Sequence, residues 1–158
     1  MIKKNCRLCN SEKLFKFLDL GLHPPSDQFK NKKQLDDPTT YYPLKVCSCQ
    51  KCGFKQLDYV VDPKILYQQN YPYESSLTKA GINHYTELAD STTLDYKLKK
   101  KDLAVDIGSN TGVLLNAFKK NNLNIIGIDP AENICKVARK KGIPTINSFF
   151  NKSFVKKI

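Results

Sequence analysis

Four of the six cysteines form two closely spaced pairs that could together bind one metal ion. Two residues separate Cys6 from Cys9, and two separate Cys49 from Cys52. The turn between such a pair directs backbone amides at the sulfurs, and two turns brought together give the tetrahedral four-thiolate site that Zn²⁺ prefers. We therefore predict a structural zinc site made by these four residues.

The neighbouring residues support zinc over the other chemistries of paired cysteines. Asn10 and Gly53 follow the two pairs, and these residue types best tolerate the left-handed conformation that such turns often need. A disulfide framework conflicts with a cytoplasmic setting. A redox pair would normally start a helix after a strand, which neither pair does. Cys47 is expected on a strand, packed or half-exposed, and Cys135 in a helix core.

A second group of residues has the types and spacing of a nucleoside site. In the stretch 105–112, an apolar run leads to Asp106. Gly108 and Gly112 follow, and after them the sequence has the periodicity of a helix. A second apolar run, 125–129, ends in Asp129, which is placed to accept hydrogen bonds from both ribose hydroxyls. The turn lacks the middle glycine that admits a diphosphate, which favours a ligand without one. The alternative is an ordinary strand–helix turn.

These residues would be positioned by alternating strands and helices of an α/β fold. The periodicity predicts strands at 103–107, 124–129 and 144–147, helices at 112–120 and 131–141, and a short helix from about 151. Earlier in the chain we expect an irregular connection over 21–29, a hairpin over 41–61 and a helix from Ser75 or Ser76 to about Ala89. The predicted domains are 1–61 (zinc-binding), 62–100 (a connector with a helix) and 101–158 (nucleoside-binding).

The amino-acid composition limits the kinds of partner that the chain is expected to bind. The 158 residues include 26 basic and 15 acidic ones, a net charge of +11, but the only arginines are Arg7 and Arg139. Guanine readout and bidentate phosphate binding favour arginine, so nucleic acid is not the expected partner, whereas the positive field would attract an anionic substrate. The chain has no apolar run of the ~20 residues that a membrane helix needs. It has no signal peptide either, so we expect it in the cytoplasm.

In this order and spacing, the motifs resemble the first part of the sugar C-methyltransferase family. That family has a four-cysteine zinc domain, which is followed by a class I S-adenosylmethionine-dependent methyltransferase domain. The matching segments are Cys6-Arg-Leu-Cys9, Leu18-Asp-Leu-Gly21, Pro25-Ser-Asp-Gln-Phe29, Cys49-Gln-Lys-Cys52-Gly53, Tyr71-Pro-Tyr-Glu-Ser-Ser76, Asp106-Ile-Gly-Ser-Asn-Thr-Gly112, Gly127-Ile-Asp-Pro-Ala131 and Gly142-Ile-Pro-Thr145. The implied fold is a small β-rich zinc domain plus the first three strands of a Rossmann-like sheet.

The resemblance also implies ligands and site residues. The four paired cysteines would hold Zn²⁺, and the substrate would be a nucleotide-activated deoxysugar. Asp129, followed by Pro130, would hold the cofactor ribose. Tyr71 or Tyr73 either faces substrate or packs at the domain junction. The methionine end of S-adenosylmethionine would be lined by Asp106, Gly108, Ser109, Asn110 and Gly112.

Two departures from the family limit what the chain is expected to do. Position 111 is Thr where the family usually has Asp. The family's catalytic Tyr-His-Glu-His segment belongs beyond residue 158, and His23 and His84 lie in other contexts, so the catalytic residues are unknown. We therefore expect a truncated or split enzyme that is inactive alone.

The missing strands lead to a competing hypothesis. Without a fourth strand, the strand at 103–107 would present an open apolar edge. The chain could instead be a zinc-dependent assembly module that completes its sheet on a partner chain. A basic zinc-ribbon nucleic-acid binder is the third possibility.

Overall fold

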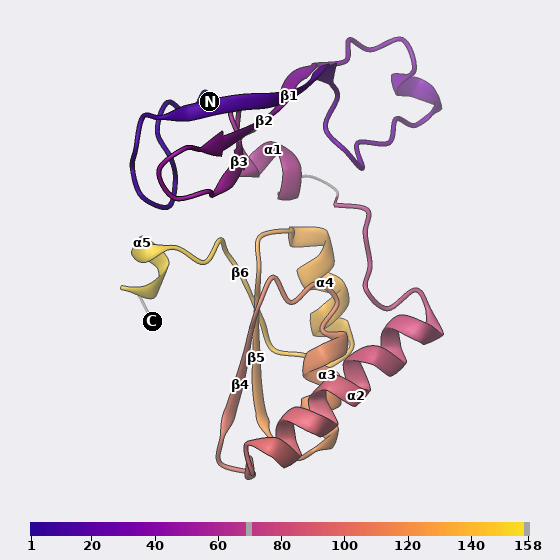
Figure 1. The fold of residues 1–158 in the computed structure, drawn as a ribbon. Helices are drawn as coiled ribbons and strands as arrows, with labels where there is room; N and C mark the ends of the chain where they lie inside the picture. Colours follow the sequence, from indigo (N-terminus) through magenta and orange to yellow (C-terminus); the bar gives the residue numbers. More distant parts are fainter. Residues whose placement is uncertain (69–70, 157–158) are drawn as a thin grey trace. The chain divides into compact units, whose positions relative to one another are not determined.

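The structure is a computed structural model that describes residues 1–68 and 71–156. The chain forms two compact units, Met1–Leu66 and Tyr67–Ile158 (Figure 1). Within the described residues, no helix combines the length and the apolar character needed to cross a membrane.

The Met1–Leu66 unit is built on a three-stranded antiparallel sheet in the order β1-β2-β3. The strands are β1 (Leu14–His23), β2 (Tyr42–Cys49) and β3 (Lys55–Leu57), with η1 (Lys32–Gln34) and α1 (Pro63–Tyr67) outside the sheet. The predicted hairpin is present as β2 and β3, joined by the turn that carries Cys49 and Cys52.

The irregular connection predicted over 21–29 begins later than expected, because β1 continues to His23. The pairing of β1 with β2 shifts register between Asp19 and Leu22. Gly21 lies in this irregularity with a φ of 79° and donates its backbone N–H to the Asp19 carboxylate at 2.9 Å. Glycine adopts the left-handed conformation that such a bulge needs, so the strand can continue beyond the irregularity, where a bulkier residue would end it.

The Tyr67–Ile158 unit contains a parallel three-stranded sheet in the order β4-β5-β6. The strands are β4 (Leu103–Ile107), β5 (Asn124–Asp129) and β6 (Thr145–Asn147), and the helices are α2 (Lys79–Asp95), α3 (Val113–Lys120), α4 (Glu132–Lys140) and α5 (Lys152–Val155). The antiparallel sheet near the cysteines and this half of a Rossmann-like sheet confirm the predicted α/β fold class.

Helix α2 differs from its prediction at both ends. Its N-cap is Thr78, whose hydroxyl accepts from the backbone N–H of Gly81, rather than Ser75 or Ser76. It continues past Ala89 to Asp95 because its inner face packs on α3: Ala89 is fully buried with Ala117, Phe118 and Leu123. Tertiary packing therefore extends a helix whose Ser- and Thr-rich final turns have little helix propensity of their own.

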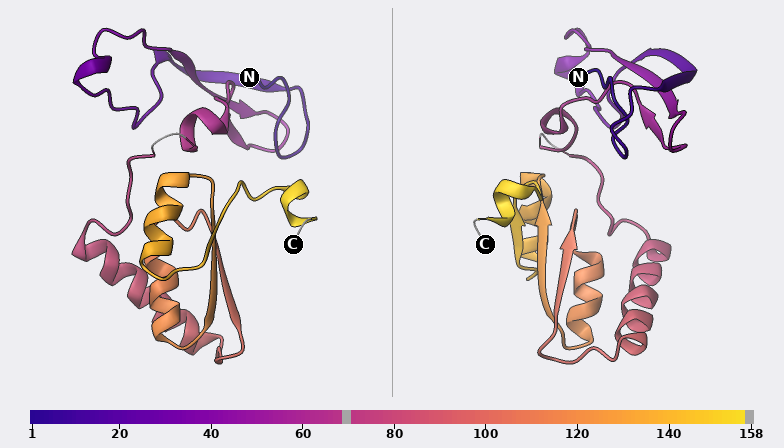
Figure 2. Two further views of the ribbon diagram at one scale, coloured as in Figure 1. Left: turned by 180° about the vertical axis from the view of Figure 1, so that it is seen from behind. Right: turned by 60° about the vertical axis from the view of Figure 1, so that its left-hand side comes forward.

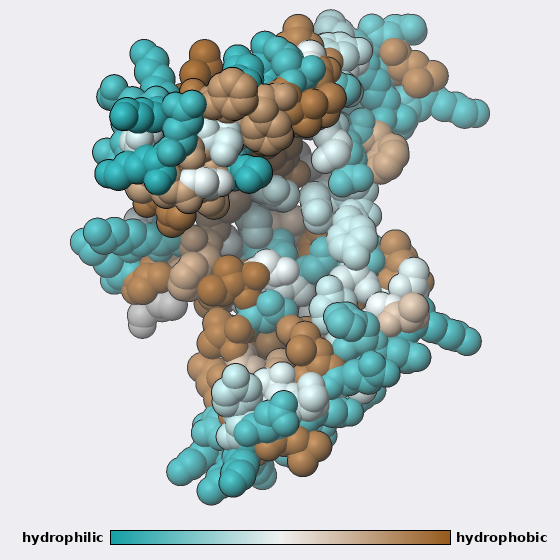
Figure 3. All heavy atoms as spheres, viewed as in Figure 1, coloured by the Kyte–Doolittle hydropathy of each residue, from teal (hydrophilic) through white to brown (hydrophobic). Residues whose placement is uncertain are grey.

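Helices α3 and α4 lie on one side of the parallel sheet, and α2 packs outside α3 (Figures 1 and 2). The opposite face of β4 is left bare, with Leu103, Val105 and Ile107 exposed by 58%, 51% and 55%. Figure 3 shows hydrophobic residues gathered over β4 and β5 on this face. Among the described strands, β4 pairs only with β5, so the expected open apolar edge is present.

Candidate functional site: a four-thiol cluster and an acid-lined glycine turn

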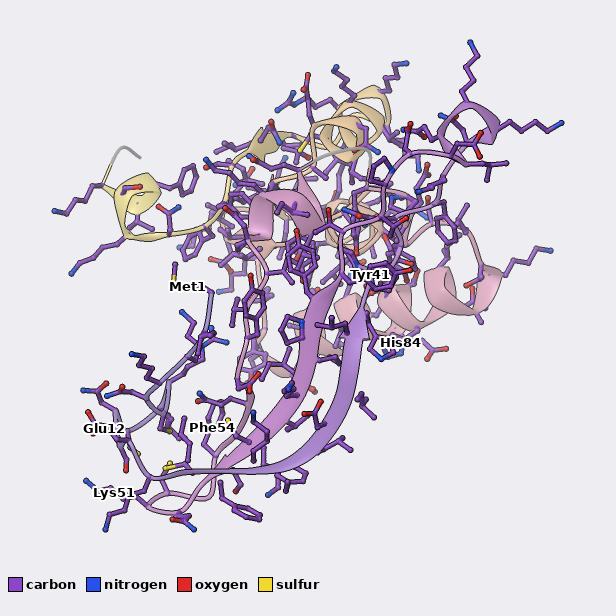
Figure 4. All side chains as sticks on the ribbon, turned by 90° about the horizontal axis from the view of Figure 1, so that it is seen from above. Met1, Glu12, Tyr41, Lys51, Phe54 and His84 are labelled. Atoms are coloured by element: carbon purple, nitrogen blue, oxygen red, sulfur yellow. The ribbon has the colours of Figure 1, made fainter. Side chains whose placement is uncertain are left out.

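The structure brings the four paired cysteines together at one end of the antiparallel sheet. Their Sγ atoms all lie within 4.8 Å of one another, and the sulfurs gather between the turns near Glu12 and Lys51 in Figure 4. The Cys6–Cys52 and Cys9–Cys49 sulfur pairs are each 3.6 Å apart. Four thiolates at about 2.3 Å from one Zn²⁺ would lie about 3.8 Å from each other, so the cluster has the size of a tetrahedral zinc site.

Each cysteine pair lies in a turn with the same backbone hydrogen bonds. The N–H groups of Asn10 and Gly53 donate to the carbonyls of Cys6 and Cys49, at 2.9 and 2.8 Å. Asn10 and Gly53 have φ values of 59° and 76°, the left-handed conformation that the sequence predicts after each pair. The two turns are therefore equivalent halves of one site, as in zinc knuckles.

Backbone amides make two of the thiols acidic. The N–H of Cys9 is the main cause of the lowered pKa of Cys6. Burial raises the pKa of Cys49, but hydrogen bonds from the N–H groups of Cys52 and Lys51 outweigh it and lower that pKa to about 6. Hydrogen bonds that favour a thiolate favour the form that binds a metal ion.

A buried glutamine, which sequence reasoning missed, ties the first turn to the sheet. Gln56 on β3 is 5% exposed; its Oε1 accepts from the N–H of Arg7 at 2.8 Å, and its Nε2 donates to the carbonyl of Asn5 at 3.1 Å. The sequence signal that could have identified it is a polar residue at the inward-facing position of a short strand. The side chain of Gln56 thus holds the backbone on both sides of Cys6, at Asn5 and Arg7.

Replacing this residue, as Gln56→Ala, should destabilise the Met1–Leu66 unit by about 1–3 kcal/mol, because it leaves the backbone N–H of Arg7 and the C=O of Asn5 without partners. Urea unfolding of the zinc-loaded chain measures this difference. Gln50→Ala, at an exposed position in the second cysteine turn, is the matched control and should change stability little. Equal effects of the two substitutions would contradict the role of Gln56.

The glycine turn, residues 108–112, joins β4 to α3 through three left-handed residues. Gly108, Asn110 and Gly112 have φ values of 81°, 49° and 78°. A Cβ on Gly112 would lie 2.8 Å from the Ile143 side chain, so both conformation and space require glycine there. The helix begins with no side-chain cap, which leaves its first amides available to a ligand.

Ser109 points into the protein rather than outward. It is 4% exposed, and its hydroxyl lies 2.4 Å from where a Cβ on Gly127 would be. Gly127 is therefore needed so that β5 can pass beneath the turn. In this arrangement the Ser109 side chain packs, and only its backbone can face a ligand.

Asp129 links the two strand ends. Its two carboxylate oxygens accept from the N–H groups of Asn110 at 2.9 Å and Ala131 at 2.8 Å, and the residue is only 7% exposed. A carboxylate oxygen has room for two acceptor interactions, so the same group could also accept from ribose hydroxyls. Pro130 follows it and immediately precedes Ala131, the N-cap of α4.

The Asp106 carboxyl is partly buried and lies close enough to Asp129 to be affected by its charge. Burial, and secondly the charge of Asp129, raise the pKa of the Asp106 carboxyl. An acid whose folded pKa is raised weakens the fold once it ionises. A cationic ligand at this edge of the sheet would relieve that repulsion.

Asp106→Asn should raise the stability of the Tyr67–Ile158 unit at neutral pH. The folded unit holds the Asp106 proton more tightly than the unfolded chain does, so this residue's contribution to stability falls as pH rises from the ordinary carboxyl pKa through the raised one. The gain should vanish at a pH well below the ordinary carboxyl pKa. Urea unfolding across this range tests it, with exposed Glu87→Gln as control; a gain independent of pH would contradict it.

The tyrosine–serine segment, residues 71–76, lies against the glycine turn. The Asn110 side chain accepts from the N–H of Ser75 at 2.9 Å and donates to the carbonyl of Tyr73 at 3.0 Å. Tyr73 itself is 55% exposed, and the rings of Tyr71 and Tyr67 are 5.9 Å apart. Thr111, at the family's usual Asp position, is buried and bonds Ser76 through its hydroxyl at 3.2 Å.

The candidate site has two parts. One is a four-thiol cluster on a small antiparallel sheet, and the other is an acid-lined glycine turn on half of a Rossmann-like sheet. Residues 6–67 match the family described as "putative zinc binding domain". Over 145 residues, 92% of this chain, the sequence is 30% identical to the C-methyltransferase NovU of Streptomyces niveus. The match covers 34% of that protein, so the chain spans about a third of the length of the curated relative it matches.

These comparisons confirm the predicted resemblance to part of a C-methyltransferase. Zinc binding is supported by the family match and by the cysteine cluster together. The chain thus joins a zinc-binding region to a region of methyltransferase resemblance.

Proposed function

We propose that this chain is the zinc-binding and cofactor-binding part of an S-adenosylmethionine-dependent C-methyltransferase that acts on a nucleotide-activated deoxysugar. The observation that carries the proposal is the pair of acids at the ends of β4 and β5, on either side of the glycine turn, in a chain similar to a C-methyltransferase. Ligands of open α/β sheets bind at the carboxyl ends of the strands.

The donor set of the second unit fits the proposed cofactor. Asp106 and Asp129 supply negative charge for a ligand that carries a sulfonium and an ammonium group. The uncapped first turn of α3 offers free amides to its carboxylate. Gly108 and Gly112 let the backbone approach closely, and the cofactor, when bound, supplies an electrophilic methyl group.

Within this proposal the first unit has a structural role. Cys6, Cys9, Cys49 and Cys52 hold Zn²⁺ as four thiolates, which leaves no open coordination position for catalysis. None of the six cysteines, all of which lie within the described residues, forms a disulfide. A reducing cytoplasm, where we place the chain, keeps cysteines in this state. We assign no residue of this chain as the base that would deprotonate the sugar, so we expect the chain to be inactive alone.

Isothermal titration of S-adenosylmethionine and S-adenosylhomocysteine into the zinc-loaded chain tests the cofactor assignment. We expect saturable binding with a one-to-one stoichiometry, and no binding of ATP, because the glycine turn lacks the middle glycine that admits a diphosphate. A folded chain that binds neither sulfur compound would refute the proposal.

The bare face of the parallel sheet favours a second candidate function, a zinc-dependent assembly module that completes its sheet on a partner chain. Leu103, Val105 and Ile107 form an apolar face beside an unpaired strand edge, and such surfaces mark interaction sites.

Sedimentation of the purified chain over a wide concentration range separates the two candidates. Assembly through this face predicts a stable complex that Val105→Lys dissociates, whereas Leu77→Lys, at a residue that is 72% exposed and lies outside the sheet, leaves it intact. A stable monomer would argue against the assembly module.

A further inference from the structure

We propose that Asn110 and Asn133 are positioning residues that hold the tyrosine–serine segment across the cofactor site before the cofactor binds. This inference rests on the proposed function and deepens it, because it says how the free chain prepares the site. The hydrogen bonds of two asparagine side chains from different elements carry it.

The hydrogen bonds of the Asn110 side chain go to this segment and to the adjacent glycine turn. Its Oδ1 accepts from the Ser75 N–H at 2.9 Å, the Ser75 hydroxyl at 3.2 Å and the Thr111 N–H at 2.8 Å. Its Nδ2 donates to the Tyr73 carbonyl at 3.0 Å. The side chain that the family resemblance places against the cofactor is therefore committed to the protein.

Asn133 binds the other end of the segment. From the first turn of α4, its Oδ1 accepts from the Tyr71 N–H at 3.2 Å, and its Nδ2 donates to the Tyr71 carbonyl at 2.8 Å. A carboxamide paired with both backbone groups of one residue acts like a neighbouring strand and fixes that residue's orientation.

Together the two asparagines stretch the segment across the carboxyl ends of two strands. Asn110 follows β4 and Asn133 follows β5, and the acids Asp106 and Asp129 lie at those same strand ends. Further hydroxyl contacts, Thr111 to Ser76 at 3.2 Å and Lys141 Nζ to Ser76 at 3.0 Å, hold the segment's last residue. The backbones of Tyr71 and Tyr73 are thus anchored beside the proposed cofactor site.

Anchoring the segment in advance has a thermodynamic consequence. An untethered segment would have to be ordered during binding, and the lost conformational freedom would weaken the apparent affinity. A segment already held by five side-chain hydrogen bonds from Asn110 and Asn133 avoids that loss. Cofactor affinity should therefore depend on Asn133 although this residue is none of the predicted cofactor ligands.

The decisive variant is Asn133→Asp, which keeps the shape and the acceptor for the Tyr71 N–H. It places a carboxylate oxygen against the Tyr71 carbonyl in place of a donor, so the pair is broken. It should not weaken α4, because a negative charge in the first turn favours the helix. The matched control is Asn124→Asp at the other end of β5, which loses an equivalent amide-to-carbonyl bond to Lys100 at 3.2 Å.

Two measurements decide the proposal: hydrogen–deuterium exchange of residues 71–76 in the free chain, and titration with S-adenosylhomocysteine. Asn133→Asp should speed exchange in the segment and weaken binding roughly tenfold, about the net worth of one or two hydrogen bonds, while Asn124→Asp changes neither. Pro72→Gly, which loosens the segment without touching either asparagine, should act in the same direction.

The possible failures are distinguishable. If the unaltered chain binds cofactor and Asn133→Asp binds it equally well despite faster exchange, the positioning role is overturned and the proposed function stands. Unchanged exchange in Asn133→Asp overturns the tether itself. If the unaltered folded chain binds no cofactor, the proposed function fails, and this inference fails with it.

Discussion

Removing zinc from the chain should unfold the Met1–Leu66 unit while the Tyr67–Ile158 unit keeps its fold. The buried apolar residues of the first unit are Cys6, Cys47 and Cys49, and two of these belong to the cluster. Along β1, all residues after Leu14 are exposed. A unit with so little core depends on its metal, and structural zinc sites contribute about 10–16 kcal/mol of folding free energy near neutral pH.

The experiment adds a strong chelator and follows hydrogen–deuterium exchange peptide by peptide, so that each unit reports on itself. Protection in β1, β2 and β3 should disappear. Protection in α3, β5 and α4 should persist, because the buried clusters around Ala117 and Leu115 consist wholly of residues from the second unit. A metal-free chain that retains protection in β2 would show that zinc is dispensable.

A pair of cysteine variants provides the control. Cys49→Ser should abolish stoichiometric zinc, measured by elemental analysis, and should leave the first unit unfolded. Cys47→Ser removes a buried thiol two residues away whose Sγ lies 3.4 Å from the carbonyl of Gln56. A serine hydroxyl can donate the same hydrogen bond, so this variant should keep its zinc and its fold. Loss of zinc from both variants would mean that folding, not ligation, was lost.

The elements around the proposed cofactor site could be predicted closely from the sequence. The strands β4 and β5 have the predicted bounds, because each is a short apolar run that ends in an acid and a turn. The predicted end of the helix at residue 141 is close to the observed end of α4 at Lys140, and Gly142 follows in a left-handed conformation with a φ of 74°. Local signals suffice where the turn chemistry and the hydrophobic period agree.

Other elements were fixed by contacts that the sequence does not display. Ser75, Ser76 and Thr78 offer the same capping chemistry within four residues, and Thr78 alone caps α2 because the two serines bond to Asn110 and Thr111 instead. Strand β1 is held by pairing with β2, whose partner residues lie between 19 (His23 and Tyr42) and 35 (Leu14 and Cys49) positions later in the sequence. All residues of β1 after Leu14 are exposed, so burial does not distinguish an inward from an outward face of this strand.

The geometry of the site also depends on distant partners. The side chains of Gln56 and Asn133 satisfy backbone groups that lie 51 and 62 residues away in the sequence. The inward position of Gln56 on a short strand indicates a buried polar side chain, but nothing in the sequence near Gln56 or Asn133 identifies the distant backbone groups that they satisfy. The cysteine pairs could be predicted because metal ligation requires a fixed local spacing of the cysteines. A side chain that hydrogen-bonds a distant backbone group requires no such spacing in the sequence.

Asp129→Ala should strongly destabilise the second unit. It deletes the acceptors of two backbone N–H groups, and Ala131 beside it is 1% exposed, so water cannot easily replace the lost bond. Each unsatisfied buried donor costs about 1–3 kcal/mol, so we expect a loss of about 2–6 kcal/mol in urea unfolding. This is a large part of the roughly 5–15 kcal/mol of a whole domain, and the sheet here is bare on one face.

Cofactor binding should fall with it, and the two effects can be separated. If Asp129 accepts from both ribose hydroxyls as we propose, losing these two charge-assisted bonds should weaken binding about a hundredfold or more, even in the fraction that remains folded. Asp129→Asn keeps one acceptor oxygen and the side-chain volume, so it should lie between the unaltered chain and Asp129→Ala in both measurements. Asp102→Ala is the control, since Asp102 also accepts from a backbone N–H, that of Lys99 at 2.7 Å, but in an exposed loop. If Asp129→Ala is destabilised but its folded fraction binds S-adenosylhomocysteine normally, Asp129 is only a clamp between the two strand ends and the ribose has another partner.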